Sequence, residues 1–164
     1  MSRTLFLDFD GVIATSGTYK RARSALIPQA WGPPEKVWTH PGEDLLSAEL
    51  AANVQELCVL TGAQVVLSTS WRNLYSLETL KGWLTTKGLT AEVVGVTPVL
   101  YGKTRGTEID AFMHTRDLTA QDIVILEDEE DVRPYRARQV KTSFMGSNAG
   151  FTKRHLARAL KLWV

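Results

Sequence analysis

Cysteine is almost absent from this chain of 164 residues, which carries a single one, Cys58. One cysteine forms no intramolecular disulfide and builds no cysteine-rich zinc site, so both are excluded. Cys58 lies among leucines and valines at helical spacing, where we expect it to be buried as a small hydrophobic side chain. A run of about 18 apolar residues, the mark of a membrane-spanning helix, is also missing. Because the first apolar strand begins at Thr4, we see no room for a signal peptide and expect a cytoplasmic protein.

An excess of charge of one sign is lacking too. The chain has 19 Lys and Arg against 18 Asp and Glu, a formal net charge of +1, so composition alone indicates no nucleic-acid partner and leaves only local patches open. A nucleophile elbow, a P-loop and a dinucleotide fingerprint are absent. The histidines His40, His114 and His155 are far apart and show no metal-ligand spacing, so we expect each at the surface.

What the chain does have is an alternation of strand-like and helix-like segments within a length that suits one domain, residues 1–164. Apolar runs typical of strands lie at 4–8, 64–69, 92–96, 123–127 and 139–144. Apolar residues at helical spacing lie at 46–60, 76–87, 106–114 and after an expected N-cap at Thr152. This alternation predicts an α/β three-layer sandwich with a Rossmann-like parallel sheet of about five strands.

Residues 14–44 interrupt the alternation with prolines and glycines, so we expect an irregular loop or flap there. Basic and aromatic residues are interleaved in it: Tyr19, Lys20, Arg21, Arg23, Trp31, Lys36 and Trp38. Such a mixture suits contact with a phosphate backbone and stacking on bases. It equally suits aromatic side chains that anchor a long loop to the domain, and both interpretations stay open.

Two aspartates follow the first strand in the segment LFLDFDGVI. Side chains alternate along a strand, so Asp8 and Asp10 should point the same way at its carboxyl end, where parallel sheets place their ligands. Two neighbouring carboxylates repel each other unless a cation or a shared proton compensates, which indicates a metal site or an acid/base pair. A strand-end turn closed by Gly11 is the simpler structural alternative.

The second strand ends in three hydroxyl residues, Ser68, Thr69 and Ser70, followed by Arg72. In a doubly wound sheet this end lies beside Asp8, so the hydroxyls can bind phosphoryl oxygens and Arg72 can add a charge-assisted hydrogen bond to substrate. A helix cap with Arg72 at the surface explains the same residues.

Lys103 and Arg105 stand at the start of the third expected helix, where the helix dipole disfavours cations. Holding a phosphate would be a reason for a cation there, and a solvated surface pair is the alternative.

The fourth strand runs into Glu127 and Asp128, at the level where Asp8 is expected. A third carboxylate at that level suits Mg²⁺, with Asp128 the first choice and Glu127 the second.

These segments together resemble the haloacid dehalogenase superfamily of phosphohydrolases. Its first motif is matched by the segment Asp8-Phe9-Asp10-Gly11-Val12. Its other three motifs are matched by Thr69 (or Ser68 in another register), by Arg105 or Lys103, and by Glu127-Asp128. Glu at the first position of the last pair departs from the usual Asp-Asp or Gly-Asp.

The resemblance implies a role for each of these residues. Asp8 would attack phosphorus and form an aspartyl-phosphate, while Asp10 would act as the acid and base. Thr69, Ser70 and the motif-three cation would bind phosphate. Asp8, Asp10 and the acidic pair would hold Mg²⁺.

The strings LFLDFDGVI, VVLSTSWR and KTRGTEI are most similar to small domains of this superfamily in RNA-repair proteins. That similarity implies no large cap domain and a phosphorylated substrate, with a nucleotide or a nucleic-acid terminal phosphate ranked first. A small phosphorylated metabolite or a phosphoprotein ranks behind it, and a binding module that has lost turnover is the non-enzymatic alternative.

Overall fold

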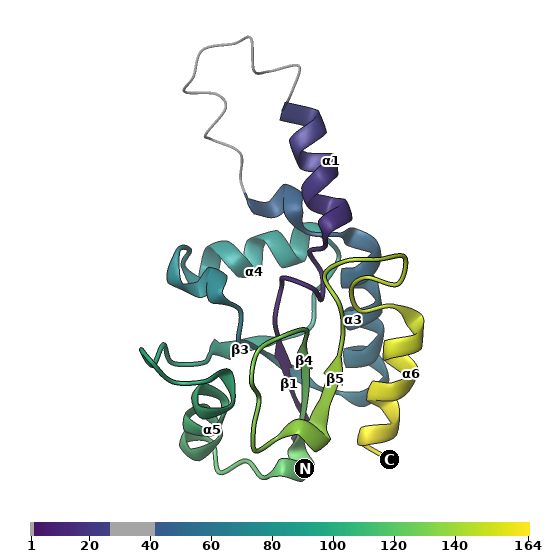
Figure 1. Cartoon of the computed structure of the whole chain (residues 1–164). Helices are drawn as coiled ribbons and strands as arrows, with labels where there is room; N and C mark the ends of the chain where they lie inside the picture. The colour runs from purple at the N-terminus through teal and green to yellow at the C-terminus, as the bar shows by residue number, and fades with distance from the viewer. Residues whose placement is uncertain (1, 27–41) are drawn as a thin grey trace.

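A computed structural model of the chain describes residues 2–26 and 42–164, and its centre is a parallel five-stranded sheet (Figure 1). The strands are β1 (Thr4–Leu7), β2 (Gln64–Leu67), β3 (Val93–Val96), β4 (Ile123–Glu127) and β5 (Gln139–Lys141). Their spatial order is β3-β2-β1-β4-β5, and every adjacent pair is parallel. The expected α/β fold is confirmed, with each strand shorter than or equal to its expected range.

Helices connect the strands, and all of them but the first, which extends away from the sheet, pack on its two faces (Figure 1). They are α1 (Ser16–Leu26), α3 (Ala48–Thr61), α4 (Leu77–Thr86), α5 (Arg105–Thr115) and α6 (Lys153–Leu162). Hydroxyl side chains cap several of them: the Ser47 side chain accepts from the Leu50 N–H at 3.2 Å before α3, and Thr104 accepts from the Thr107 N–H at 3.2 Å before α5. The four helical segments expected outside residues 14–44 are therefore confirmed.

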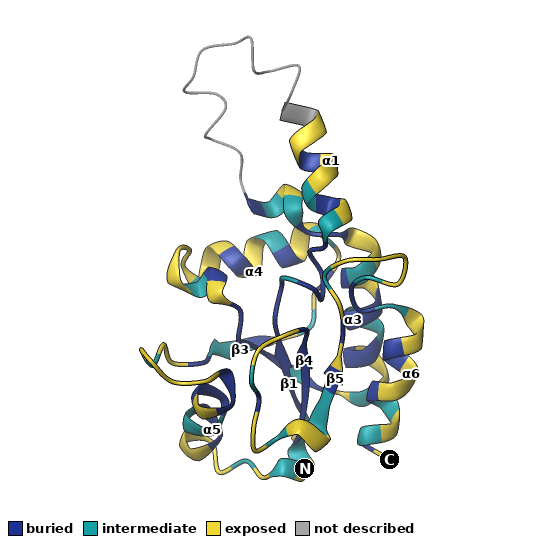
Figure 2. Ribbon diagram, viewed as in Figure 1, coloured by how far each residue is buried: buried dark blue, intermediate teal, exposed yellow. Residues whose placement is uncertain are grey.

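The two faces of the sheet are covered by different helices. Leu5 and Leu7 of β1 belong to a core shared with α3, α4 and α6, whereas Phe6 between them packs with α5. Period-two alternation on a central strand thus builds both cores at once. Figure 2 shows the central strands β1 and β4 buried, with helices on either side that have exposed outer faces. The sheet with helices on both of its faces makes up the three layers that the sequence pattern predicts. The described residues contain no large cap unit. That the chain forms one domain over residues 1–164 stays a prediction.

The start of the 14–44 segment differs from expectation. Residues 16–26 form α1, where we expected irregular chain, and residues 42–45 form a short 3₁₀ turn, η2 (Gly42–Leu45). The helix begins with reciprocal hydrogen bonds between Thr15 and Thr18, and its sequence is mostly polar, so little apolar periodicity reveals it. Trp31, Lys36, Trp38 and His40 lie outside the described residues.

His155 is buried rather than at the surface, with 7% of its area exposed. Its ring Nδ1 accepts from the Thr152 backbone N–H at 3.1 Å, closing a capping box at the first turn of α6. The expectation of a surface position was wrong because the His155 ring caps a helix. The absence of metal-ligand spacing, on which the expectation was based, says nothing about such a cap. His114 is exposed as expected, Cys58 is buried as expected, and Thr152 is the N-cap.

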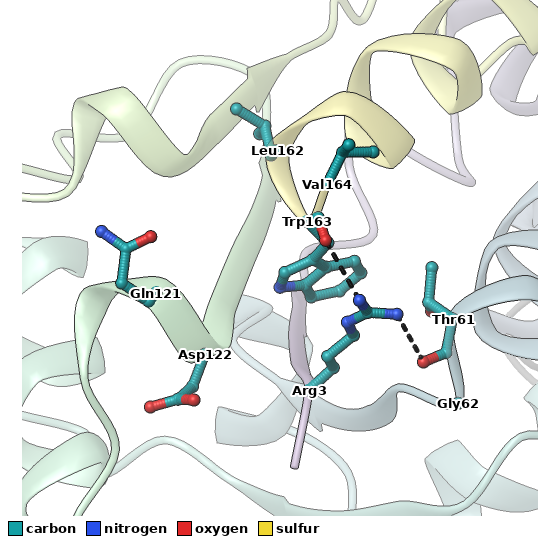
Figure 3. A pocket seen from close by; sticks show the side chains of 8 residues that line it. All are labelled: Arg3, Thr61, Gly62, Gln121, Asp122, Leu162, Trp163 and Val164. Atoms are coloured by element: carbon teal, nitrogen blue, oxygen red, sulfur yellow. Dashed lines mark hydrogen bonds between the residues drawn. The ribbon is translucent and has the colours of Figure 1, made fainter. Parts of the chain in front are cut away.

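At the amino end of the sheet, the chain closes around Arg3 (Figure 3). Its guanidinium donates to the carbonyl oxygens of Thr61 at 3.1 Å and Trp163 at 3.0 Å and lies 5.9 Å from the centre of the Trp163 ring. These residues line a cavity of about 260 Å³. In the part of the chain that is described, no helix is both long and apolar enough to span a membrane.

Candidate active site

A larger cavity of about 610 Å³ opens at the carboxyl end of the sheet. Its lining comes from the segments that follow β1, β2, β4 and β5 and from the starts of α1 and α5. The residues are Asp8, Asp10, Tyr19, Ser70, Arg105, Asp128, Glu129, Glu130 and 141–145. Five residues proposed from the sequence for catalysis or binding are thus brought to one place, where parallel sheets hold their ligands.

A tight turn after β1 shapes the floor of this cavity. The Phe9 carbonyl accepts from the backbone N–H groups of Val12, Ile13 and Ala14, and Gly11 adopts φ +79°. A Cβ on Gly11 would lie 2.2 Å from Asp128 Oδ2. Only glycine fits both this backbone and this close approach, so Gly11 is what allows Asp128 to stand against the turn.

Three carboxyl groups form an acidic cluster under the cavity: Asp8, Glu127 and Asp128. One oxygen from each lies within 4.8 Å of the others, and all three residues are less than a tenth exposed. Burial is the main cause that raises the pKa of Asp8 and, with the negative charge of Asp8, that of Glu127. The cluster therefore carries more negative charge than its protein surroundings stabilise.

The acidic cluster fits a divalent cation. Its donors are carboxylate oxygens, the ligands that Mg²⁺ prefers. Glu127 Oε2 is fully buried and receives no hydrogen bond from any described residue. Both members of the acidic pair at the end of β4 belong to the cluster, and the preference for Asp128 over Glu127 as a metal ligand stays a prediction.

Arg105 is the buried cation among the residues that line this cavity, and Lys141 is an exposed one. Arg105 is the first residue of α5, it is buried, and its Nε lies 3.3 Å from Glu127 Oε2 while its Nη1 donates to Glu108 Oε2 at 3.3 Å. The contacts with these two carboxylates explain why a cation stands at the start of a helix, where the helix dipole disfavours it. Lys103 is exposed and does not line the cavity, so the structure favours Arg105 of the two.

Arg72 does not reach the cavity, which corrects the substrate-binding role expected for it. Its guanidinium donates to the carbonyl oxygens of Ser68, Thr69, Thr97 and Pro98 and to Glu108 Oε2, the last at 2.6 Å. These acceptors occupy it fully. Because Glu108 contacts Arg105 as well, Arg72 helps to fix the orientation of Arg105.

Of the three hydroxyl residues after β2, Ser68 and Thr69 are buried and Ser70 is exposed. Thr69 is fully buried, and its Oγ1 accepts from the Trp71 N–H at 3.3 Å, which caps the short helix η3 (Ser70–Asn73). Ser70 is exposed and lines the cavity. Ser68 Oγ is buried without a hydrogen-bond partner among the described residues, away from the cavity lining. Ser70 is thus the hydroxyl side chain best placed to meet a ligand.

Asp10 lies beside the acidic cluster without belonging to it. Its Oδ1 accepts from the Tyr19 hydroxyl at 2.8 Å, and its Oδ2 accepts from the Trp71 indole Nε1 at 2.9 Å. Burial, and secondarily the bond to Asp10, raises the pKa of Tyr19, which keeps the hydroxyl protonated as a donor. Tyr19 therefore anchors α1 to the domain. Anchoring is one of the two interpretations given above for the aromatic residues of 14–44.

One wall of the cavity, formed by the last residue of β5 and the segment that follows it (141–145), was not predicted from the sequence. Thr142 is buried there, and its Oγ1 has no hydrogen-bond partner in the described residues. Phe144 packs edge-on against Tyr19 at 5.5 Å. The rule that ligands sit at the carboxyl ends of parallel strands was the available signal, but the weak strand pattern at 139–144 concealed where β5 ends.

Comparison with known proteins identifies what this arrangement is similar to. The family model for the haloacid dehalogenase (HAD) domain in Swiss Army Knife RNA repair proteins matches residues 4–156. A haloacid dehalogenase-like hydrolase from Streptococcus pneumoniae shares the fold with a TM-score of 0.50 at 14% identity, over 96% of this chain and 90% of that one. CbbY from Rhodobacter sphaeroides, solved with phosphate, gives a TM-score of 0.44 at 14% identity over 79% of each chain. No curated protein matches.

Proposed function

Since this chain belongs to the family of HAD domains found in Swiss Army Knife RNA repair proteins, we propose that it is a magnesium-dependent phosphomonoesterase. Its substrate in this proposal is the terminal phosphate of a nucleic acid or a nucleotide. One observation carries the proposal: Asp8, Asp10, Arg105 and Asp128 line a single cavity at the carboxyl end of the sheet. Those are the nucleophile, acid/base, cation and metal-ligand positions that the family resemblance implies.

The chemistry follows from the positions of these side chains. Asp8 attacks phosphorus in line and displaces the leaving oxygen, forming an aspartyl-phosphate. Asp10 gives a proton to that oxygen and later removes one from the water that hydrolyses the intermediate. Arg105 neutralises charge on the phosphoryl oxygens, as it already does near Glu127, and Ser70, which lines the cavity, supplies a hydrogen bond. Thr69 is buried behind the cavity lining and caps η3, so its contribution is to hold Ser70 in place.

Mg²⁺ would be held by Asp8, Glu127 and Asp128 together with the backbone of Asp10. When bound, it would offset the repulsion between an anionic nucleophile and an anionic phosphate. The raised pKa values of Asp8 and Glu127 support this part of the proposal, because a cation at the cluster favours the ionised form that Asp8 needs for attack.

Two features support a large substrate over a small metabolite. The described residues contain no cap unit over the cavity, and its outer wall carries exposed Lys141 and Met145 beside Phe144. Exposed cations of α1, Lys20, Arg21 and Arg23, stand on the helix that leaves the same region. A cation and apolar side chains at an open mouth suit a phosphate backbone and a base.

The test is phosphate release from oligonucleotides that carry a 3′ or a 5′ terminal phosphate, compared with a phosphopeptide and a sugar phosphate, with and without Mg²⁺. We expect turnover that needs Mg²⁺, that prefers an oligonucleotide, and that falls at least about 1,000-fold in Asp8→Asn. Because burial raises the pKa of Asp8, that variant should be no less stable than the native chain. Retained turnover in Asp8→Asn would refute the mechanism. Preference for the sugar phosphate would refute the substrate class.

A further inference from the structure

The carboxyl group of Asp10 is held differently from the other three acids of the site. Asp8, Glu127 and Asp128 face one another, whereas each oxygen of Asp10 accepts from a separate donor. One donor, Tyr19, comes from α1 and the other, Trp71, from η3, so two distant segments converge on one side chain. Tyr19 lies outside the strings that resemble the family, whereas Trp71 belongs to the string VVLSTSWR but had no role assigned to it.

We propose that Tyr19 and Trp71 are positioning residues that fix the carboxyl group of Asp10 in one orientation, apart from the acidic cluster. The inference rests on the proposed function, in which Asp10 transfers a proton to and from the reacting oxygens. A carboxyl group turns about two single bonds, and a single hydrogen bond leaves it free to rotate around that contact. Two donors on its two oxygens remove this freedom.

The two donors are themselves braced by aromatic packing. The Tyr19 ring lies edge-on to Phe144 at 5.5 Å, and the Ser16 N–H donates to the Phe144 carbonyl at 2.9 Å. The Trp71 indole is buried and packs edge-on against Phe9 at 5.2 Å and Trp83 at 6.3 Å. Neither ring can follow a rotating carboxyl group, so each bond defines a fixed point.

Both donors leave part of the Asp10 carboxyl group open to the reacting atoms. The Tyr19 hydroxyl donates to Oδ1 and the Trp71 indole N–H donates to Oδ2. A carboxyl group has about four lone-pair sites, so each oxygen keeps one beyond the bond to its donor. Asp10 can thus keep both partners and its orientation while it contacts the reacting oxygens.

The experiment compares two esters of similar size that differ in the need for a proton on the leaving oxygen. Nitrophenolate from 4-nitrophenyl phosphate leaves unaided, whereas the alkoxide from benzyl phosphate needs the proton from Asp10. We expect Tyr19→Phe, which keeps the ring against Phe144, to lower kcat/KM about tenfold for benzyl phosphate and less than about twofold for 4-nitrophenyl phosphate. Trp71→Phe should show the same asymmetry.

Tyr135→Phe is the matched control. The Tyr135 hydroxyl also donates to an aspartate, Asp110, but outside the cavity, so its loss should leave both esters unchanged. An equal loss on both esters in Tyr19→Phe, or no loss, overturns the positioning role while native turnover keeps the proposed function. A native chain that hydrolyses neither ester overturns the positioning role in this form, and the proposed function falls with it only if terminally phosphorylated oligonucleotides also release no phosphate. If Trp71→Phe fails to fold, Tyr19→Phe alone decides.

Discussion

The two ends of the same sheet hold cavities that use arginine in opposite ways. At the amino end, the charge of Arg3 is surrounded by neutral carbonyl oxygens of Thr61 and Trp163 and by an indole ring. At the carboxyl end, Arg105 stands among carboxylates whose combined charge exceeds its own. An arginine whose neighbours are neutral acceptors completes a structural contact, whereas carboxyl groups that repel one another are relieved by a proton or by a bound cation.

Breaking the carboxyl end should have the largest effect. Arg105→Met leaves Glu127 without its buried cation and Glu108 with Arg72 alone, so we expect a loss on the order of 3–5 kcal/mol in the free energy of unfolding. Turnover should fall at least about 100-fold. Arg105→Lys keeps the charge and should recover part of both. Urea denaturation and initial rates measure the two effects, and an unaltered rate in Arg105→Met would remove Arg105 from the proposed site.

Gly11→Ala should damage the same end through geometry alone. The new Cβ would stand 2.2 Å from Asp128 Oδ2, and φ +79° is unfavourable for alanine by about 1–2 kcal/mol. We expect a stability loss of at least that size and a weaker response to Mg²⁺, since Asp128 must move. Gly62→Ala is the control, because Gly62 also has positive φ but its Cβ would contact nothing. Equal Mg²⁺ responses in the two variants would contradict the close approach.

Arg3→Met tests the amino end and should separate stability from function. It removes two hydrogen bonds to carbonyl oxygens and a cation–π contact, which predicts a loss of about 1–3 kcal/mol. Turnover of the folded variant should stay within about twofold of native, because no residue of the catalytic cavity contacts Arg3. A selective loss of rate at full folding would show that the two ends are coupled.

The smallest effect belongs to His155, which lies in neither cavity. Burial, and then the charges of Arg158 and Arg154, lower its pKa below the ordinary 6.5. The unfolded chain therefore takes up the proton first, so this contribution to stability is complete above about pH 7 and declines as the pH falls through 6.5. His155→Gln preserves a capping-box acceptor but does not titrate. The difference in Tm between native and variant should change between pH 7.5 and 5.5, and a constant difference would refute the assignment.

The sequence predicts the sheet well because strands buried on both faces are continuous apolar runs. Strands 123–127 and 64–69 were placed within two residues, and the motif positions Asp8, Arg105 and Asp128 follow from where strands end and helices begin. The ends of strands and the starts of helices are determined by neighbouring residues in the sequence, so the sequence alone is sufficient to place these three side chains.

What could not be predicted depends on contacts between distant segments. Arg72 resembles a phosphate ligand in sequence, but four carbonyl oxygens and Glu108 surround it once β2 and β3 lie side by side. The partners of Asp10 are 9 and 61 residues away along the chain, and no spacing rule connects them. Helix α1 escaped prediction because a mostly polar helix has a weak apolar stripe.

The hydrogen bond from Arg3 to Trp163 places the start of β1 beside the end of α6 (Figure 3). Asp8 follows the opposite end of β1, roughly 16 Å away at the usual rise of a strand. A tether attached beyond Val164, which is fully exposed, therefore leaves from the side of the molecule opposite the cavity that Asp8 lines. Immobilised on a surface through that tether, the protein would present this cavity to solution, where the proposed oligonucleotide substrates can be added.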